Sequence, residues 1–104
     1  MTSDALISVV IVTWNGRQYL DACLTAAAAQ VGVRIETILV DNASTDGTVD
    51  YVRERFPSVR VVSLSENRGF AGGNNAGVRE ARGQFVALLN NDTVPEPTWL
   101  QTLL

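Results

Sequence analysis

Residues 7–13 read Ile-Ser-Val-Val-Ile-Val-Thr, an almost unbroken run of β-branched side chains. A run without polar alternation is typical of a strand that is buried on both faces, as in a parallel sheet. Turn residues follow at 14–16, and then an alanine-rich stretch with Leu20, Cys23, Leu24 and Ala27 at helical spacing. The segment therefore predicts a strand, a turn and a helix, the repeating unit of α/β proteins.

The same unit recurs along the chain. Three further strands are predicted from apolar and β-branched runs, at 35–40, 59–64 and 85–89. The helix between the second and third strands is predicted from about Thr48 to Phe56, where Pro57 closes it. Gly32 is expected to lie past the end of the first helix, where a stop is typical.

The stretch at 66–75 is rich in glycine, which disfavours regular structure. We therefore expect it to be irregular, with a helix that begins only near its end and finishes at Gly83. After the last strand, Pro95 and Pro97 introduce a short final helix, with Pro97 in its first turn.

The alternation of strands and helices predicts an α/β fold with one domain at 1–104. Its sheet should be open and mainly parallel, with helices on both faces. We expect the domain to stop after the fourth strand and the helix that follows, which leaves a sheet edge open to self-association. Ligands of such sheets bind beyond the carboxyl ends of the strands.

Composition excludes several kinds of chemistry. The chain contains no histidine and no lysine, which excludes a histidine base, a histidine zinc site, a Schiff-base lysine and a P-loop lysine. The net charge of −3 and the lack of a basic run argue against a nucleic-acid partner.

The location expected from the sequence is cytoplasmic. The single cysteine, Cys23, cannot form an internal disulfide, which fits a reducing compartment. The first residues include Asp4 and no positive region, so they do not read as a signal peptide. For the full-length protein we also expect peripheral attachment at the inner face of the membrane.

Polar clusters follow all four predicted strands, at 13–15, 41–46, 67–75 and 90–92. Asp41 can accept a hydrogen bond from a ribose hydroxyl or a base N–H, and Asp92 can hold a hard cation through oxygen. Trp14 can stack on a base or belong to the core. For Ser44 and Asp46 a simpler role stays open, since both can cap the following helix.

Four ordered motifs, VIVTWNG, LVDNASTDGT, NRGFAGGNNAG and LLNNDT, span residues 10–93. Together they resemble the N-terminal part of family 2 glycosyltransferases with the GT-A fold. Within that family they resemble most the rhamnosyltransferase-like branch. The resemblance covers essentially the whole chain from residue 7.

The resemblance implies a nucleotide site built from Thr13, Trp14, Asn15, Asp41, Asn42, Ser44, Asn67, Arg68, Gly69, Asn75 and Asn91. It implies that Trp14 lies against the base, that Asp41 binds the base or ribose, and that Arg68 lies near both. Residues 90–92 match the D-x-D motif, which implies that Asp92, with Asn90, binds a divalent cation, Mg²⁺ or Mn²⁺, that meets the diphosphate.

Two departures from the family pattern matter. Asn90 replaces the first acid of D-x-D, which removes a negative charge and should weaken metal binding. The catalytic residue is unknown, because the family's general base is an acid well downstream and is expected here beyond Leu104, together with acceptor recognition. We therefore expect this chain alone to be inactive.

For the intact enzyme the resemblance implies metal-assisted transfer of a sugar, with inversion, to an acceptor hydroxyl. The implied donor is a nucleotide-diphosphate sugar, with dTDP or UDP favoured, and the implied acceptor is a glycan or a lipid-linked molecule. Two alternatives are a non-catalytic nucleotide-binding α/β module, such as a receiver domain, and a nucleotidyltransferase. A receiver needs a lysine that is absent here, and residues 13–17 do not resemble the basic, glycine-rich phosphate loop of nucleotidyltransferases.

Overall fold

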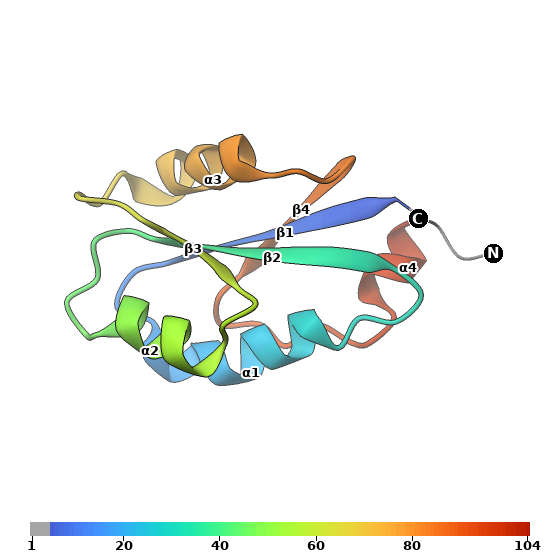
Figure 1. The fold of residues 1–104 in the computed structure, drawn as a ribbon, viewed down its shortest axis with the longest axis horizontal. Coiled ribbons are helices and arrows are strands. Elements are labelled where there is room, and N and C mark those ends of the chain that lie inside the picture. Colours follow the sequence, from blue (N-terminus) through green and yellow to red (C-terminus); the bar gives the residue numbers. More distant parts are fainter. Residues whose placement is uncertain (1–4) are drawn as a thin grey trace.

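Strands and helices alternate in the computed structural model, which describes residues 5–104 (Figure 1). In chain order the elements are β1 (Leu6–Thr13), α1 (Arg17–Ala28), β2 (Arg34–Asp41), α2 (Thr48–Arg55), β3 (Arg60–Ser63), α3 (Gly69–Glu80), β4 (Phe85–Asn90) and α4 (Trp99–Leu103). The strands predicted at 7–13, 35–40 and 85–89 are each observed with one or two more residues. The third strand is shorter than the predicted 59–64.

The sheet has the order β3-β2-β1-β4, and every pairing in the described chain is parallel. Thr13 stands opposite Asp41, and Asp41 stands opposite Ser63. On the other side of β1, Val12 stands opposite Asn90. This register brings the polar residues that follow the four strands to one edge of the sheet.

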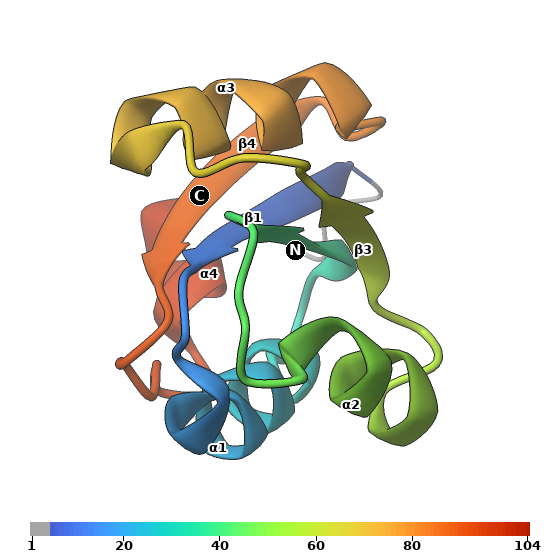
Figure 2. The ribbon, with the colours of Figure 1, turned by 90° about the vertical axis from the view of Figure 1, so that its left-hand side faces the viewer.

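Helices cover both faces of the sheet, as the sequence predicted (Figures 1 and 2). On one face, α1, α2 and α4 bury Leu24, Val52 and Leu100 against Val9 and Ile11 of β1. On the other face, Ala76 of α3 packs on a smaller cluster from β1 and β2, made of Val10, Ile38 and Val40. Burial of these apolar side chains is the main force that holds the layers together.

The prediction of an irregular stretch at 66–75 was wrong, because α3 already begins at Gly69, and its predicted end at Gly83 was three residues late. The reason is close packing of the helix on the sheet. A Cβ on Gly73 would come within 2.6 Å of Val12 Cγ1, and a Cβ on Gly77 would come still closer to Val10. These glycines make room for the strand, so tertiary contact outweighs their low helix propensity.

Gly32 lies past the end of α1, as the sequence predicted; the C-cap of that helix is Ala29, and Gly32 has a φ of +74° before β2. One smaller prediction was wrong: Pro97 does not stand in the first turn of α4, because it precedes Thr98, the N-cap of that helix. Within residues 5–104, no helix is both long and apolar enough to cross a bilayer.

Candidate functional site

The loops after β1, β2 and β3 gather on the left of Figure 1 and face the viewer in Figure 2, and the segment after β4 runs from there toward α4. The loop after β1 carries Trp14 and Asn15, and the loop after β2 carries residues 42–47. The segment between β3 and α3 carries Asn67 and Arg68, and residues 91–98 follow β4. All four predicted polar clusters therefore lie at the carboxyl edge of the sheet, where α/β proteins bind ligands.

Hydrogen bonds join the loops after β1 and β2. The Asn15 amide donates to Ser44 Oγ at 2.9 Å, and the Thr45 amide donates to Asn15 Oδ1 at 2.8 Å. Asn15 and Ala43 both have positive φ, at 49° and 61°. For non-glycine residues this conformation carries strain, which the surrounding contacts must offset. The hydroxyl of Ser44 therefore links the loops after β1 and β2 and does not cap α2.

Asp46 holds the N-termini of two helices. Its Oδ2 accepts from the Arg17 amide at the start of α1, and its Oδ1 accepts from the amide and the hydroxyl of Thr48 at the start of α2. Burial favours the neutral acid, but the hydrogen bonds from Thr48 and Arg17 outweigh it and lower the pKa of Asp46. The capping role left open for Asp46 is confirmed, and it extends to two helices.

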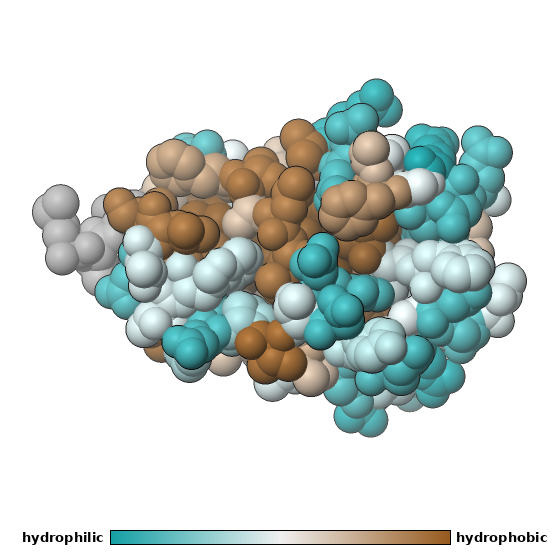
Figure 3. All heavy atoms as spheres, turned by 180° about the vertical axis from the view of Figure 1, so that it is seen from behind, coloured by the Kyte–Doolittle hydropathy of each residue, from teal (hydrophilic) through white to brown (hydrophobic). Residues whose placement is uncertain are grey.

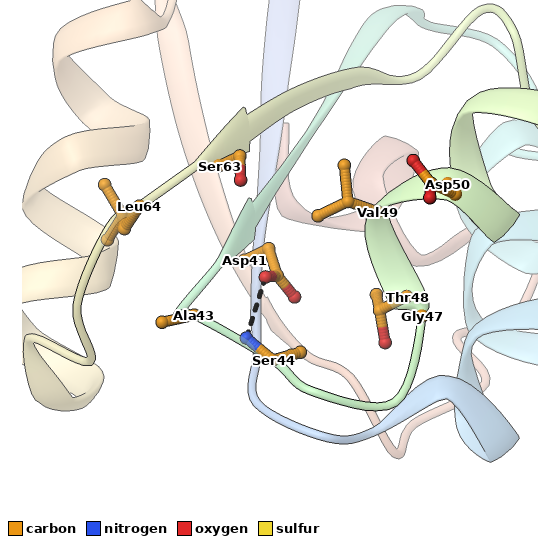
Figure 4. A pocket seen from close by; sticks show the side chains of 9 residues that line it. All are labelled: Asp41, Ala43, Ser44, Gly47, Thr48, Val49, Asp50, Ser63 and Leu64. Carbon is orange, nitrogen blue, oxygen red and sulfur yellow. Dashed lines mark hydrogen bonds between the residues drawn. The ribbon is translucent and has the colours of Figure 1, made fainter.

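Asp41 is the most unusual acidic side chain at this edge. The residue is 1% exposed, and its Oδ2 accepts from the Ser44 amide at 3.0 Å (Figure 4). Its other oxygen, Oδ1, is buried and has no hydrogen-bond partner in the described chain. A buried acceptor without a partner is costly, so this atom calls for a donor from outside the protein.

A cavity of about 330 Å³ opens at Asp41. Its walls come from the ends of β2 and β3 and the start of α2, as Figure 4 shows. They consist of Asp41, Ala43, Ser44, Gly47, Thr48, Val49, Asp50, Ser63 and Leu64. We call this the Asp41 cavity. Among these residues the sequence analysis assigned nucleotide contacts only to Asp41 and Ser44. Val49, Asp50, Ser63 and Leu64 lie outside the motifs and reach the cavity through the folding of β3 and α2.

Asn42 fastens the segment before α3 to the end of β2. Asn42 is 3% exposed; its Oδ1 accepts from the Arg68 amide, and its Nδ2 donates to the Gly69 carbonyl, both at 3.0 Å. Asn67 Oδ1 accepts from the Gly69 amide at 2.8 Å, and Gly69 has a φ of +74°. The predicted residues Asn42, Asn67, Arg68 and Gly69 thus form one hydrogen-bonded unit.

A second cavity, of about 290 Å³, lies between the end of β1 and the start of α3. Its walls consist of Val12, Thr13, Trp14, Asn42, Asn67, Gly69, Phe70 and Asn91. Trp14 and Phe70 are 58% and 61% exposed, so neither belongs to the core. Exposed aromatic faces beside amide groups suit a planar base or the apolar face of a sugar ring. Phe70 was not among the predicted site residues, although it lies inside the motif NRGFAGGNNAG.

Asn91 is fixed by its hydrogen bond from Nδ2 to Thr13 Oγ1, at 2.9 Å. Gly16 lies against this pair, since a Cβ there would come within 2.7 Å of Thr13 Oγ1. The loop after β4 is therefore packed directly on the loop after β1. This contact needs glycine at position 16.

Cys23 lies beneath the Asn90–Asp92 motif. It is buried in α1, and its thiol donates to the Asn90 carbonyl over 3.6 Å. Burial, together with the negative charge of Asp92, raises the pKa of Cys23 to about 11. Cys23 therefore supports the motif as a neutral packing group, as the sequence indicated.

The residues at 90–92 fit a cation that is shared with a ligand. Asn90 and Asp92 are exposed at the end of β4. Within residues 5–104, no group of three or more His, Cys, Asp or Glu side chains is placed to hold a metal ion. Mg²⁺ commonly binds through one or two carboxylates, with phosphate oxygens and water completing the shell. The exposed carboxylate of Asp92, next to the side-chain amides of Asn90 and Asn91 in the sequence, agrees with that kind of site.

Five of the predicted site residues line neither cavity: Asn15, Arg68, Asn75, Asn90 and Asp92. Asn75 is exposed in the second turn of α3. Arg68 is also exposed, and its backbone, not its guanidinium, is the group held by Asn42. A role for Asn75 at the nucleotide therefore stays a prediction from the resemblance.

The sequence model of glycosyl transferase family 2 matches residues 8–104. The chain belongs to glycosyl transferase family 2. It is 33% identical over 99 residues to the succinoglycan biosynthesis protein ExoO of Rhizobium meliloti, covering 94% of this chain and 28% of that protein. It is 36% identical over 90 residues to a putative teichuronic acid biosynthesis glycosyltransferase of Bacillus subtilis, TuaG, covering 84% of this chain and 36% of that protein.

Solved family 2 structures have the same fold. A mannosyltransferase from Pyrobaculum calidifontis, in complex with GDP-Man and Mn²⁺, superposes with a TM-score of 0.83 at 31% identity, covering 92% of this chain and 30% of that one. TarS from S. aureus, in complex with UDP-GlcNAc, gives a TM-score of 0.82 at 26% identity, covering 99% and 30%. The expected GT-A-like α/β fold is thus confirmed, and this chain spans about a third or less of these proteins.

Proposed function

We propose that this chain forms the donor site of an inverting glycosyltransferase, which transfers a sugar from a nucleoside diphosphate to an acceptor hydroxyl. The observation that carries the proposal is the buried Oδ1 atom of Asp41, which has no partner and lies at a cavity on the carboxyl edge of the sheet. Family membership supplies the reaction class, and this atom indicates where the donor binds.

The Asp41 cavity suits the nucleoside end of the donor. An ionised carboxylate only accepts hydrogen bonds, so Asp41 Oδ1 would take a base N–H or a ribose hydroxyl. Asp50 also lines the cavity, and two carboxylates would repel a diphosphate. The diphosphate would therefore extend away from Asp41, along Trp14 and the second cavity, toward Asp92.

Asp92, together with Asn90, would hold a divalent cation, Mg²⁺ or Mn²⁺. When bound, such a cation neutralises the charge that develops on the departing diphosphate. The Pyrobaculum relative was solved with GDP-Man and Mn²⁺, which supports this assignment. Asn91, held by Thr13, would keep the loop in place whether or not the cation is present.

The transfer we propose is a single displacement. The acceptor hydroxyl attacks the anomeric carbon from the side opposite the nucleoside diphosphate, while a carboxylate takes its proton. Among the acidic groups at this edge, Asp41 is buried and Asp46 accepts hydrogen bonds at two helix starts. Asp50 lines the cavity proposed for the nucleoside, and Asp92 would hold the cation at the diphosphate. We therefore assign the general base to a part of the enzyme beyond Leu104, and we expect no turnover by this chain alone.

The donor and acceptor are narrower proposals. We favour a dTDP- or UDP-sugar and a glycan or lipid-linked acceptor, as the family resemblance implies. Asp41 could accept a hydrogen bond from the ring N–H of uracil or thymine, and equally from the N–H groups of guanine. TarS was solved with UDP-GlcNAc and the Pyrobaculum enzyme with GDP-Man, so family members differ in base. None of the four relatives compared above is named as a rhamnosyltransferase, and that branch stays a prediction from the motifs alone.

We also propose a cytoplasmic location, with peripheral attachment of the full-length protein at the inner face of the membrane. The buried, unpaired thiol of Cys23 is compatible with a reducing compartment. Fractionation of cells that produce the full-length protein tests this location. Recovery of the protein on the outer side of the cytoplasmic membrane would contradict it.

Calorimetric titration with UDP, dTDP and GDP, with and without Mn²⁺, tests the donor site. Asp41→Asn presents an N–H donor to the ligand in place of an acceptor and should weaken binding by roughly tenfold or more. Asp92→Ala should remove the dependence on Mn²⁺ but leave weak metal-free binding. Glu54→Gln, an exposed change of carboxylate to amide on α2, is the matched control. Unchanged binding by Asp41→Asn would overturn the site.

A further inference from the structure

A tight turn carries Asp92 at the end of β4. The Thr93 amide donates to the Asn90 carbonyl at 3.2 Å, so residues 90–93 form a β-turn with Asn91 and Asp92 at its corners. Seen from behind, hydrophilic side chains gather at the carboxyl edge of the sheet, on the right of Figure 3. The conformation of the turn decides how the Asp92 carboxylate is presented at this edge.

The side chain of Thr93 closes the same turn a second time. Its hydroxyl donates to the Asn90 carbonyl at 2.6 Å, a shorter distance than that of the amide. A carbonyl oxygen has two lone pairs, and here the amide and the hydroxyl of one residue use both. The main-chain carbonyl of Asn90 is therefore not free to bind a cation, which leaves the side chains of Asn90 and Asp92 for that role.

Two neighbouring segments hold the first half of the turn. The Cys23 thiol, in α1, lies against the Asn90 carbonyl at 3.6 Å. Thr13 Oγ1, at the end of β1, accepts a hydrogen bond from Asn91 Nδ2 at 2.9 Å. In the part of the chain that the structure describes, the hydrogen bonds of the second half of the turn are the two from Thr93. Thr93 therefore controls the half that carries the carboxylate.

We propose that Thr93 is a positioning residue for the cation site, because its hydroxyl fixes the turn that presents Asp92 and Asn90 before a cation binds. The inference rests on the proposed function, which assigns a divalent cation to these two side chains. A site with a single carboxylate gains little from charge, so its affinity depends strongly on the order that exists before binding. A turn that the Thr93 hydroxyl has already closed loses less conformational entropy when a cation binds.

Titration of this chain with Mn²⁺ alone, followed by the paramagnetic broadening of the NMR signals of residues 90–93, tests the proposal. Thr93→Val keeps the branched shape but removes the hydroxyl, and should raise the Mn²⁺ dissociation constant about three- to tenfold. Thr93→Ser keeps the hydroxyl and should restore the wild-type affinity. Thr93→Ala removes the hydroxyl in a smaller side chain and should give the same loss as the valine variant.

Thr102→Val is the matched control. The Thr102 hydroxyl donates to the Thr98 carbonyl at 2.8 Å, so this variant loses the same kind of hydrogen bond in α4, away from the turn. Thermal unfolding of all the variants accompanies the titration, and we expect the two valine variants to lose stability to a similar extent. Only Thr93→Val should change the Mn²⁺ affinity, because a hydroxyl with a purely structural role would lower stability alone.

Asp92→Ala separates a failure of the proposed function from a failure of this inference. If this variant binds Mn²⁺ as the wild type does, the cation site itself is wrong, and the role of Thr93 falls with it. If Asp92→Ala loses Mn²⁺ binding but Thr93→Val binds as tightly as the wild type, the cation site stands and the role of Thr93 is overturned. A serine variant as weak as the valine variant would also overturn that role, since the hydroxyl would not be the group that acts.

Discussion

The carboxylate of Asp46 accepts a hydrogen bond from the backbone amide of Arg17, 29 residues earlier in the chain, at 3.2 Å. The same carboxylate accepts from Thr48, so one side chain fixes the starts of α1 and α2. Asn15 and Ser44 stand two residues before Arg17 and Asp46, and the hydrogen bond between them joins the two loops at the proposed donor site. Asp46 therefore sets the spacing of that site without lining either cavity.

Asp46→Ala should lower the free energy of unfolding by about 1–2 kcal/mol, because the amides at two helix starts lose their acceptor. Asp46→Asn keeps an acceptor oxygen and should cost less. Chemical denaturation, followed by circular dichroism, measures both variants. If the alanine variant is as stable as the wild type, Asp46 does not fix the two helix starts.

Glu36 should make stability depend on acid pH. Burial favours its neutral form, but hydrogen bonds from the Ser8 hydroxyl and the Arg82 amide, together with the charge of Arg60, lower its pKa. The unfolded chain therefore binds a proton at a higher pH than the folded chain does. The stabilising effect is complete above the ordinary carboxyl pKa and is lost as the pH falls through the lower, folded value.

The measurement is the free energy of unfolding of the wild type and of Glu36→Gln across the acid range. The difference between the two should be about 1–2 kcal/mol at neutral pH and should shrink toward low pH. Glu54→Gln, on the exposed surface of α2, should show no such trend. A difference that is constant with pH would argue against the ionised form of Glu36 as the stabilising species.

Gly77→Ala should destabilise the protein by about 1–3 kcal/mol, although alanine is the better helix former, because its Cβ collides with Val10 and the layers must separate. Asn75→Ala, on the exposed side of the same helix, should be neutral or slightly stabilising. Thermal unfolding of the two variants compares helix propensity with layer packing. A stabilising effect of Gly77→Ala would show that α3 does not pack closely on β1.

The thiol of Cys23 should react slowly with an alkylating or disulfide reagent in the folded protein. It is buried, and its pKa is raised to about 11, so the reactive thiolate is scarce below that pH. Adding denaturant should release the normal reactivity of a cysteine. Absorbance kinetics with a chromogenic disulfide follow both states, and a fast reaction before unfolding would contradict the burial of Cys23 beneath the Asn90–Asp92 motif.

The strand and helix order was predictable because each apolar run is local and continuous. Residues 7–13 can be recognised as a buried strand without knowledge of any other segment, and the polar residues after it must then lie at the carboxyl edge. The start of α3 was not predictable in this way. The sequence of residues 66–75 predicts an irregular stretch, and only the packing of Gly73 and Gly77 on Val12 and Val10 explains an earlier helix start.

Part of the candidate site could likewise be predicted from the sequence, and part could not. The residue types at the four strand ends, and with them the family and the proposed donor chemistry, follow from the sequence. Only the tertiary structure decided that Asp41 keeps one buried oxygen without a partner, that Phe70 and Trp14 line the same cavity, and that Asp46 joins two helix starts. The physical reason is the sequence separation of the interacting residues. A strand or a turn depends on residues that are close in the sequence, whereas the hydrogen-bond partner of a buried polar atom can come from a distant segment that folding brings next to it.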